Sequence, residues 1–163
     1  MNPSDGNDVR LPRDPAVTVG MVSLGCAKNL VDGEVMLGHL VRSGVEVTSD
    51  ATEADVVIVN TCGFIDDAKQ ESINAILDVA GARAEGTVRR LVVSGCMAQA
   101  YALELGREIP EIDAFVGLDE LERVVEAVRG EIEGHTPDQR AAARVYDHHQ
   151  PRLLSTGVFA YLK

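Results

Sequence analysis

The sequence has 163 residues, 45% of them hydrophobic, and a formal net charge of −11. That length suits one α/β domain with tails, and that apolar content can supply a packed core, which argues against general disorder. Acidic residues outnumber basic ones 26 to 15, aromatic content is only 4% and tryptophan is absent. We therefore expect no direct binding of nucleic acid by this domain. The acidic balance favours a basic protein partner, although it also serves plain solubility.

Residues 1–15 are expected to form a disordered leader. They are polar and contain three prolines. They lack both the basic start and the apolar centre of a signal peptide. The rest of the chain has no apolar run close to the roughly 18 residues that a membrane span requires. A cytoplasmic protein is the expectation.

Short runs rich in Val and Ile predict parallel strands that are buried on both faces. They cover residues 17–23, 45–48, 55–60 and 91–94, with a weaker fifth run at 114–116. Helical periodicity marks the segments between them, and glycines at 44 and 130 are suited to end two of the helices. The residues that keep this spacing are Leu37, Leu40 and Val41, then Ile73, Ile76, Leu77 and Ala80, then Leu121, Val124, Val125 and Val128, with a less regular helix over 97–108.

Alternation of strand and helix predicts βαβ units and a parallel sheet. We expect an open, doubly wound, flavodoxin-like α/β sheet of about five strands with helices on both faces, over residues 16–130. From residue 131 to residue 157 the pattern fails, because prolines, glycine and charged residues interrupt it. That stretch is interpreted as a linker. Residues 158–163 have the pattern of a first strand of another unit.

The three cysteines occupy equivalent places in three successive units. Cys26, Cys62 and Cys96 each follow the end of a predicted strand after one to three small or polar residues, and each precedes a helix. The carboxyl ends of the strands of an open parallel sheet lie along one edge, which is where ligands bind. We therefore expect the three thiols to converge in space. A chain with no sign of secretion uses cysteines more often as metal ligands or catalytic groups than as bridges.

Three thiols at helix N-termini suit a metal centre. A helix N-terminus favours the thiolate, so lowered thiol pKa values are expected there. Gly25, Gly63 and Gly95 would leave room for a sulfide cage and for N–H groups to approach sulfur. Structural zinc sites usually have four ligands. Three thiolates better suit a 4Fe–4S cluster with one iron left open, with a three-cysteine zinc site as the alternative. Cysteines of the core, or a thiol redox switch, are the non-metal alternatives.

Polar residues near the cysteines have several candidate roles. Lys28 and Asn29 could hydrogen-bond a substrate or a sulfur, or could cap the helix. Asn60 and Thr61 are expected to form the turn that carries Cys62. No function is assigned to the histidines His39, His148 and His149, and no residue is assigned a catalytic role.

Three motifs make the sequence similar to a known family. Residues 22–32 (VSLGCAKNLVD), 57–65 (VIVNTCGFI) and 94–96 (SGC) resemble the N-terminal domain of the radical-SAM methylthiotransferases. Their form is closest to the branch that modifies a ribosomal protein. The tRNA-modifying branch is the alternative within the family, and a non-enzymatic flavodoxin-like binding module is the alternative outside it. One departure is Gly33, where the branch often has serine.

The resemblance implies that Cys26, Cys62 and Cys96 hold an auxiliary 4Fe–4S cluster whose open iron carries the sulfur to be inserted. It implies a second 4Fe–4S cluster and S-adenosylmethionine in the full-length enzyme. The C-x3-C-x2-C motif of the second cluster is missing here, and residues 158–163 look like the start of the radical-SAM domain. The implied partners are the enzyme's own radical-SAM and C-terminal domains. The implied substrate is the β-carbon of an aspartate in a basic small-subunit ribosomal protein. This chain alone is not expected to catalyse that reaction.

Overall fold

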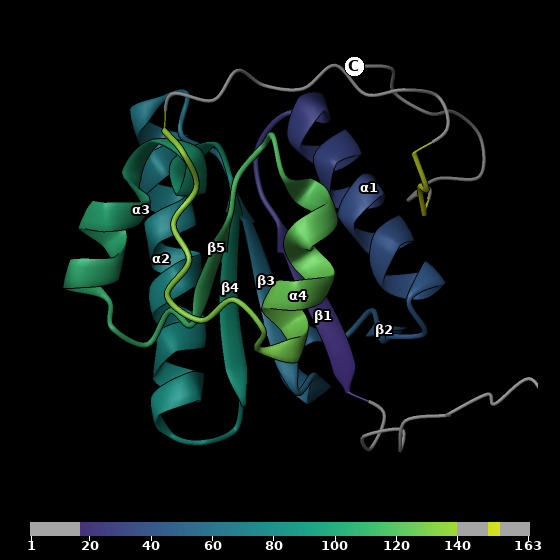
Figure 1. The fold of residues 1–163 in the computed structure, drawn as a ribbon. Coiled ribbons are helices and arrows are strands. Elements are labelled where there is room, and N and C mark those ends of the chain that lie inside the picture. The colour runs from purple at the N-terminus through teal and green to yellow at the C-terminus, as the bar shows by residue number, and fades with distance from the viewer. Residues whose placement is uncertain (1–16, 140–149, 154–163) are drawn as a thin grey trace, which may run out of the picture.

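The computed structural model describes residues 17–139 and 150–153, which form a sheet with helices on both faces. Figure 1 shows strands and helices alternating along the chain. The strands are β1 (Thr18–Ser23), β2 (Glu46–Thr48), β3 (Val56–Thr61), β4 (Arg90–Gly95) and β5 (Ala114–Val116). The helices are α1 (Ala27–Arg42), α2 (Asp66–Ala84), α3 (Cys96–Glu108) and α4 (Val124–Arg129), with short 3-10 turns at Ala51–Glu53 and Leu121–Arg123.

The five strands are all parallel and lie in the order β2-β1-β3-β4-β5. This is the flavodoxin-like order, in which the direction of winding reverses beside the first strand. The predicted fold class is confirmed. The five predicted strands agree with the observed ones to within one residue at each end.

Alternate residues of the central strands divide the core into two layers. Val57 and Val59 of β3 point to the side of α2 and α3, where they pack with Leu91 and Val93 of β4. The residues between them point to the side of α1 and α4. Figure 1 shows these two helix pairs on opposite faces of the sheet. All six residues of β3 are buried, as expected for a strand covered on both faces.

Two predictions about burial are wrong in part. The strand at residues 45–48 was expected to be buried, but Glu46 is exposed, because β2 is an edge strand with only β1 beside it. Val41 and Leu77, which keep the apolar spacing of their helices, are 49% and 50% exposed. Both residues lie at the margin of the apolar stripe of their helix, where the helix surface no longer faces the sheet.

Parts of the expected linker contact the domain. Residues 131–139 run beside β5, where the Gly134 N–H donates to the Asp113 carbonyl at 2.9 Å and the Phe115 N–H donates to the His135 carbonyl at 3.3 Å. Residues 150–153 lie against α1. The proposed boundaries at residues 15, 130 and 157 stay predictions. His148, His149 and residues 158–163 lie outside the described residues. Within the described part, no helix is long and apolar enough to cross a membrane.

The starts of β1 and β3 are joined by a polar box. The Asp55 carboxylate accepts hydrogen bonds from the N–H and the hydroxyl of Thr18, both at 3.0 Å, and the Asp55 N–H donates to the Thr18 hydroxyl at 3.1 Å. The hydrogen bond from the Thr18 N–H is the largest cause that lowers the pKa of Asp55, and the bond from the Thr18 hydroxyl is the next. Burial opposes them, and the charge of Arg89 lowers the pKa further.

A carboxyl group whose pKa is lowered by folding stabilises the protein at pH values above the pKa that the group has in the unfolded chain. This stability is lost as the pH falls through the pKa of the group in the folded protein. Thr18→Val should therefore lower the free energy of unfolding by about 1 kcal/mol at pH 7. The difference should shrink toward pH 3 but not vanish, because the bond from the Asp55 N–H does not titrate. Urea unfolding at both pH values measures this. A difference that grows on acidification would contradict it.

Candidate functional site

Paired residues on three neighbouring strands place all three cysteines at the same level along the sheet. Ser23 of β1 lies beside Asn60 of β3, and Asn60 lies beside Ser94 of β4. Cys26, Cys62 and Cys96 follow these three residues by three, two and two positions. Because the strands are parallel and in register, the chain leaves each of them at the same edge of the sheet.

The three cysteines differ in exposure. Cys26 is the N-cap residue of α1 and is exposed. Cys62 directly follows β3 and is 5% exposed. Cys96 is the first residue of α3 and is half-buried. The edge is therefore open on the Cys26 side and closed at Cys62.

Gly25 brings the Cys26 loop against Cys62. Its φ of +99° lies in the region that side chains rarely adopt. A Cβ on Gly25 would lie 2.5 Å from the Cys62 Cβ and 2.9 Å from the Cys62 Sγ. Gly95, with φ of +91°, makes a similar approach to the Thr61 backbone before Cys96. Gly63 instead abuts Met97, so its expected role of leaving room for a cage has no counterpart in these contacts.

The three thiols lie within electrostatic reach of one another. Burial raises the pKa of Cys96, and the charges of Cys62, Asp32 and Cys26 raise it further, while a hydrogen bond from the Gly63 N–H opposes the shift. The expected lowering of the Cys96 pKa by its helix N-terminus is wrong here. Loss of hydration is the largest cause, and the electrostatic effects of Cys62, Asp32 and Cys26 act in the same direction.

Two asparagines hold the Cys26 loop to the strand that carries Cys62. The Asn29 Nδ2 donates to the carbonyls of Leu24 at 2.5 Å, Thr61 at 2.8 Å and Asn60 at 3.3 Å. In return the Asn60 Nδ2 donates to the Asn29 carbonyl at 2.7 Å and to the Ser23 hydroxyl at 3.3 Å. Asn29 and Asn60 are 1% and 0% exposed. We call this pair the asparagine clasp.

The clasp corrects two expectations. Asn29 does not cap its helix, since no side chain caps α1, and it bonds backbone rather than facing a substrate. Asn60 and Thr61 are not turn residues but the last two residues of β3. The Thr61 hydroxyl donates to the Ser94 carbonyl at 2.5 Å, which ties β3 to β4. Lys28 is exposed at the start of α1.

A third anchor, Ser72, was missed from the sequence. This serine of α2 is fully buried, and its hydroxyl accepts from the Cys62 N–H and donates to the Cys62 carbonyl, both at 3.0 Å. It thereby holds the backbone of Cys62 at both polar atoms. Its only sequence signal was its place four residues before Ile76 on the buried face of α2. His39, to which no function was assigned, bonds Gln150 at 3.0 Å.

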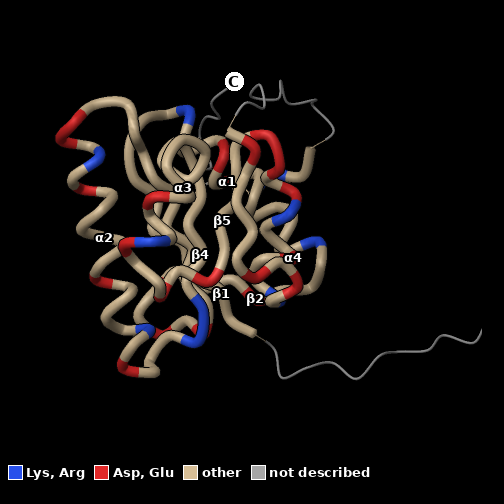
Figure 2. The backbone as a smooth tube through the Cα atoms, turned by 60° about the vertical axis from the view of Figure 1, so that its left-hand side comes forward, with Lys and Arg blue, Asp and Glu red and all other residues tan. Residues whose placement is uncertain are grey.

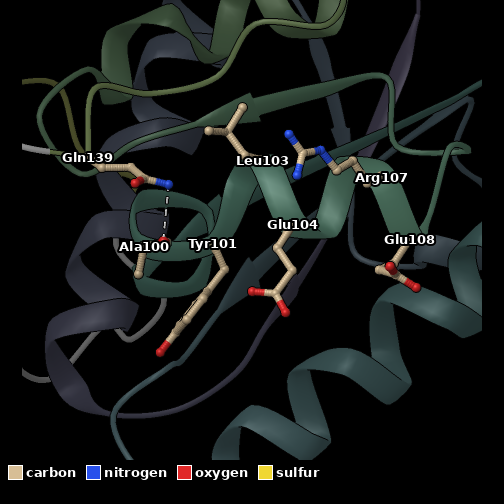
Figure 3. A pocket seen from close by; sticks show the side chains of 7 residues that line it. All are labelled: Ala100, Tyr101, Leu103, Glu104, Arg107, Glu108 and Gln139. Atoms are coloured by element: carbon tan, nitrogen blue, oxygen red, sulfur yellow. Dashed lines mark hydrogen bonds between the residues drawn. The ribbon is translucent and has the colours of Figure 1, made fainter.

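Surface hollows lie beside Cys26 and beside α3. One of about 280 Å³ lies beside Cys26 and is lined also by Ser23, Leu24, Ala27 and Leu30. A larger one of about 420 Å³ lies on the outer side of α3, where Tyr101, Leu103, Glu104 and Arg107 line it (Figure 3). None of the three cysteines lines the larger hollow. The cysteine edge is thus the candidate site, although its hollow is the smaller.

The donor set consists of three thiols at one edge of the sheet. Among the described residues, no three His, Cys, Asp or Glu side chains are close enough together to hold one metal ion. Thiolate sulfur is the usual protein ligand of iron–sulfur clusters. A Cβ at Gly25 would lie 2.9 Å from the Cys62 Sγ, so the glycine keeps the space beside that sulfur free. The residues present therefore fit the group that the sequence implied.

Fold and site together define an open parallel α/β domain with three cysteines at the carboxyl edge of its sheet. Residues 18–117 match the model of a family described as uncharacterized protein family UPF0004, and the chain belongs to that family. The sequence-based resemblance to the N-terminal domain of methylthiotransferases is confirmed by the relatives that follow.

The chain is similar to proteins named ribosomal protein uS12 methylthiotransferase RimO. It is 48% identical to that of Trichlorobacter lovleyi over 89% of this chain and 33% of the relative. It is 51% identical to that of Symbiobacterium thermophilum, over 90% of this chain and 31% of the relative. Identity to that of Geobacter sulfurreducens is 49%, over 89% and 33%. The chain thus spans about a third of the length of these relatives.

Proposed function

We propose that residues 16–130 are the auxiliary-cluster domain of a radical-SAM methylthiotransferase, with Cys26, Cys62 and Cys96 as the ligands of a 4Fe–4S cluster. The observation that carries the proposal is the register of Ser23, Asn60 and Ser94 across three parallel strands. It brings three cysteines that are far apart in sequence to one edge. The similarity to RimO proteins supports the ribosomal branch of the family.

The residues of this chain would hold the group and leave one side of it open. Cys62 is held through its backbone by Ser72, and the Cys26 loop is held by the clasp. The exposed Cys26 and the hollow beside it leave solvent access from that side. When bound, a cluster with three thiolate ligands supplies one iron that can bind sulfur.

The proposed substrate is the β-carbon of an aspartate in a basic small-subunit ribosomal protein, in the cytoplasm. Acidic residues are spread over the helices and loops of the domain rather than gathered on one face (Figure 2). Over the whole sequence, 26 acidic residues against 15 basic ones give a net charge of −11, which speeds the approach of a basic partner at low salt. If substrate affinity did not change with salt, this attraction would play no part.

The experiment uses the full-length protein that contains this chain, incubated with the ribosomal protein and S-adenosylmethionine under reducing, anaerobic conditions. Cys26→Ala should abolish methylthiolation of the aspartate, with a loss of at least about a hundredfold. It should leave cleavage of S-adenosylmethionine intact, because that reaction belongs to the second cluster. Unchanged methylthiolation would exclude a role for the cysteine edge. Product on tRNA instead of protein would support the tRNA-modifying alternative.

A further inference from the structure

Residues 150–153 contact α1 in an order that defines a direction. Gln150 bonds His39 at 3.0 Å. Pro151 lies against Gly38. The Leu153 N–H then donates to the Glu34 carbonyl at 2.9 Å. As the chain advances, its partners on α1 move from residue 39 back to residue 34. The segment therefore runs antiparallel to α1, toward the end of the helix that begins at the cysteine edge.

Gly38 makes this contact sterically feasible. A Cβ at position 38 would lie 2.5 Å from both the carbonyl carbon and the carbonyl oxygen of Pro151 and 2.7 Å from the Arg152 nitrogen. Backbone atoms cannot yield at such distances as the end of a flexible side chain can. The glycine sits in the interior of a helix, where it costs stability relative to alanine. Close approach of another segment is a physical reason for a glycine there.

A buried ion pair adds a second, independent contact. The Arg152 guanidinium binds the Glu34 carboxylate, whose side chain is 4% exposed. A carboxylate at that depth is costly unless a charged donor satisfies it. Glu34 thus contacts the segment twice, through its carboxylate and through its backbone carbonyl.

We propose that residues 150–153 form a strap that belongs to the folded domain and directs the following chain toward the cysteine edge. Glu34 and Gly38 are its positioning residues. In the longer relatives, whatever follows the strap would leave the domain along α1 in the direction of that edge. The strap does not require that the cysteines bind a cluster, so its test is made on the metal-free chain.

Trypsin cleavage after Arg152 measures whether the strap is docked. Proteolysis tracks the population of the open form when opening is fast. The wild-type chain should be cut there far more slowly than a synthetic peptide of residues 148–157. Gly38→Ala should speed cleavage at Arg152 by about tenfold or more, with helical content by circular dichroism unchanged. Cleavage of the wild type at the rate of the peptide would overturn the proposal.

Gly81→Ala is the matched control. Gly81 lies inside α2, and a Cβ there would meet nothing within 4 Å. Both substitutions improve helix propensity equally, so only a clash with the strap separates them. Glu34→Gln, which keeps the shape but removes the charge, should also speed cleavage at Arg152. If both Gly38→Ala and Glu34→Gln were cut at the wild-type rate, the strap would not be held by these residues.

The direction of the strap has its own test. The probe is a photo-crosslinking amino acid in place of Leu153, whose N–H donates to the Glu34 carbonyl. It should crosslink to residues 30–34 of α1, and Gly38→Ala should reduce that yield. Crosslinks to residues 42–44, at the other end of the helix, would contradict the proposed direction.

Discussion

Each of the single variants Cys26→Ala, Cys62→Ala and Cys96→Ala should lose most of the iron that the wild-type chain takes up when it is reconstituted anaerobically with iron and sulfide. The wild type should bind about four irons per chain, with the broad charge-transfer absorption of a 4Fe–4S cluster. A cluster left with two thiolates loses a covalent anchor and a compensating charge. We therefore expect fewer than about one iron in each variant.

These variants should still fold. Without metal, a buried cysteine behaves as a small hydrophobic residue, so truncation to alanine costs little. Met97→Leu, beside Cys96 in the core, is the control, because it keeps volume and removes no thiol; it should load iron like the wild type. Iron uptake that is indifferent to all three cysteine variants would assign the cysteines to the core. Loss with only one or two of them would exclude one shared site.

Asn60→Leu should lower the free energy of unfolding by about 3 kcal/mol, since it leaves several buried hydrogen-bonding groups without their partner. The Asn60 side chain bonds the Asn29 carbonyl and the hydroxyls of Ser23 and Ser94. The change should also loosen the Cys62 loop. Its thiol, 5% exposed in the native protein, should then react faster with a thiol reagent, by about tenfold or more. Urea unfolding and labelling rates measure the two effects.

Asn74→Leu is the matched control for the clasp. Asn74 is exposed on α2, and its Oδ1 accepts a hydrogen bond from the Gln70 Nε2 at 2.9 Å. It should change the unfolding free energy by less than about 0.5 kcal/mol and leave the reactivity of Cys62 unchanged. Equal effects of the two substitutions would show that the asparagine clasp contributes no more to stability than an exposed asparagine does. A stable Asn60→Leu protein with unreactive Cys62 would show that the loop is held without it.

The fold was predictable because its signals are local and repeated. Runs of Val and Ile predicted the strands, and the helical spacing with glycine stops predicted α1 and α4; both Gly44 and Gly130 have positive φ. The placement of the three cysteines followed from topology alone, since parallel strands with helical crossovers share one carboxyl edge. These inferences require only the local order of residues along the chain and the right-handedness of βαβ units.

Contacts between distant segments were not predictable in this way. Thr61 lies beyond the predicted strand at residues 55–60, but pairing with Gly95 of β4 extends β3 to it. The pKa of Cys96 depends on burial and on electrostatic effects from two other segments, the Cys62 loop and the start of α1. Ser72 and Gly38 carry no motif. Each is explained only by a backbone that comes from elsewhere in the chain.

By itself the sequence determined the class of fold, the order of its elements and the identity of the three cysteines that meet at one edge. The tertiary structure decided how those cysteines are held: by the asparagine clasp, by Ser72 and by glycines with positive φ. The reason is physical. Periodicity and composition report the environment averaged over a whole helix or strand. A hydrogen bond or a close approach depends on the positions of single atoms, which exist only once the segments have packed.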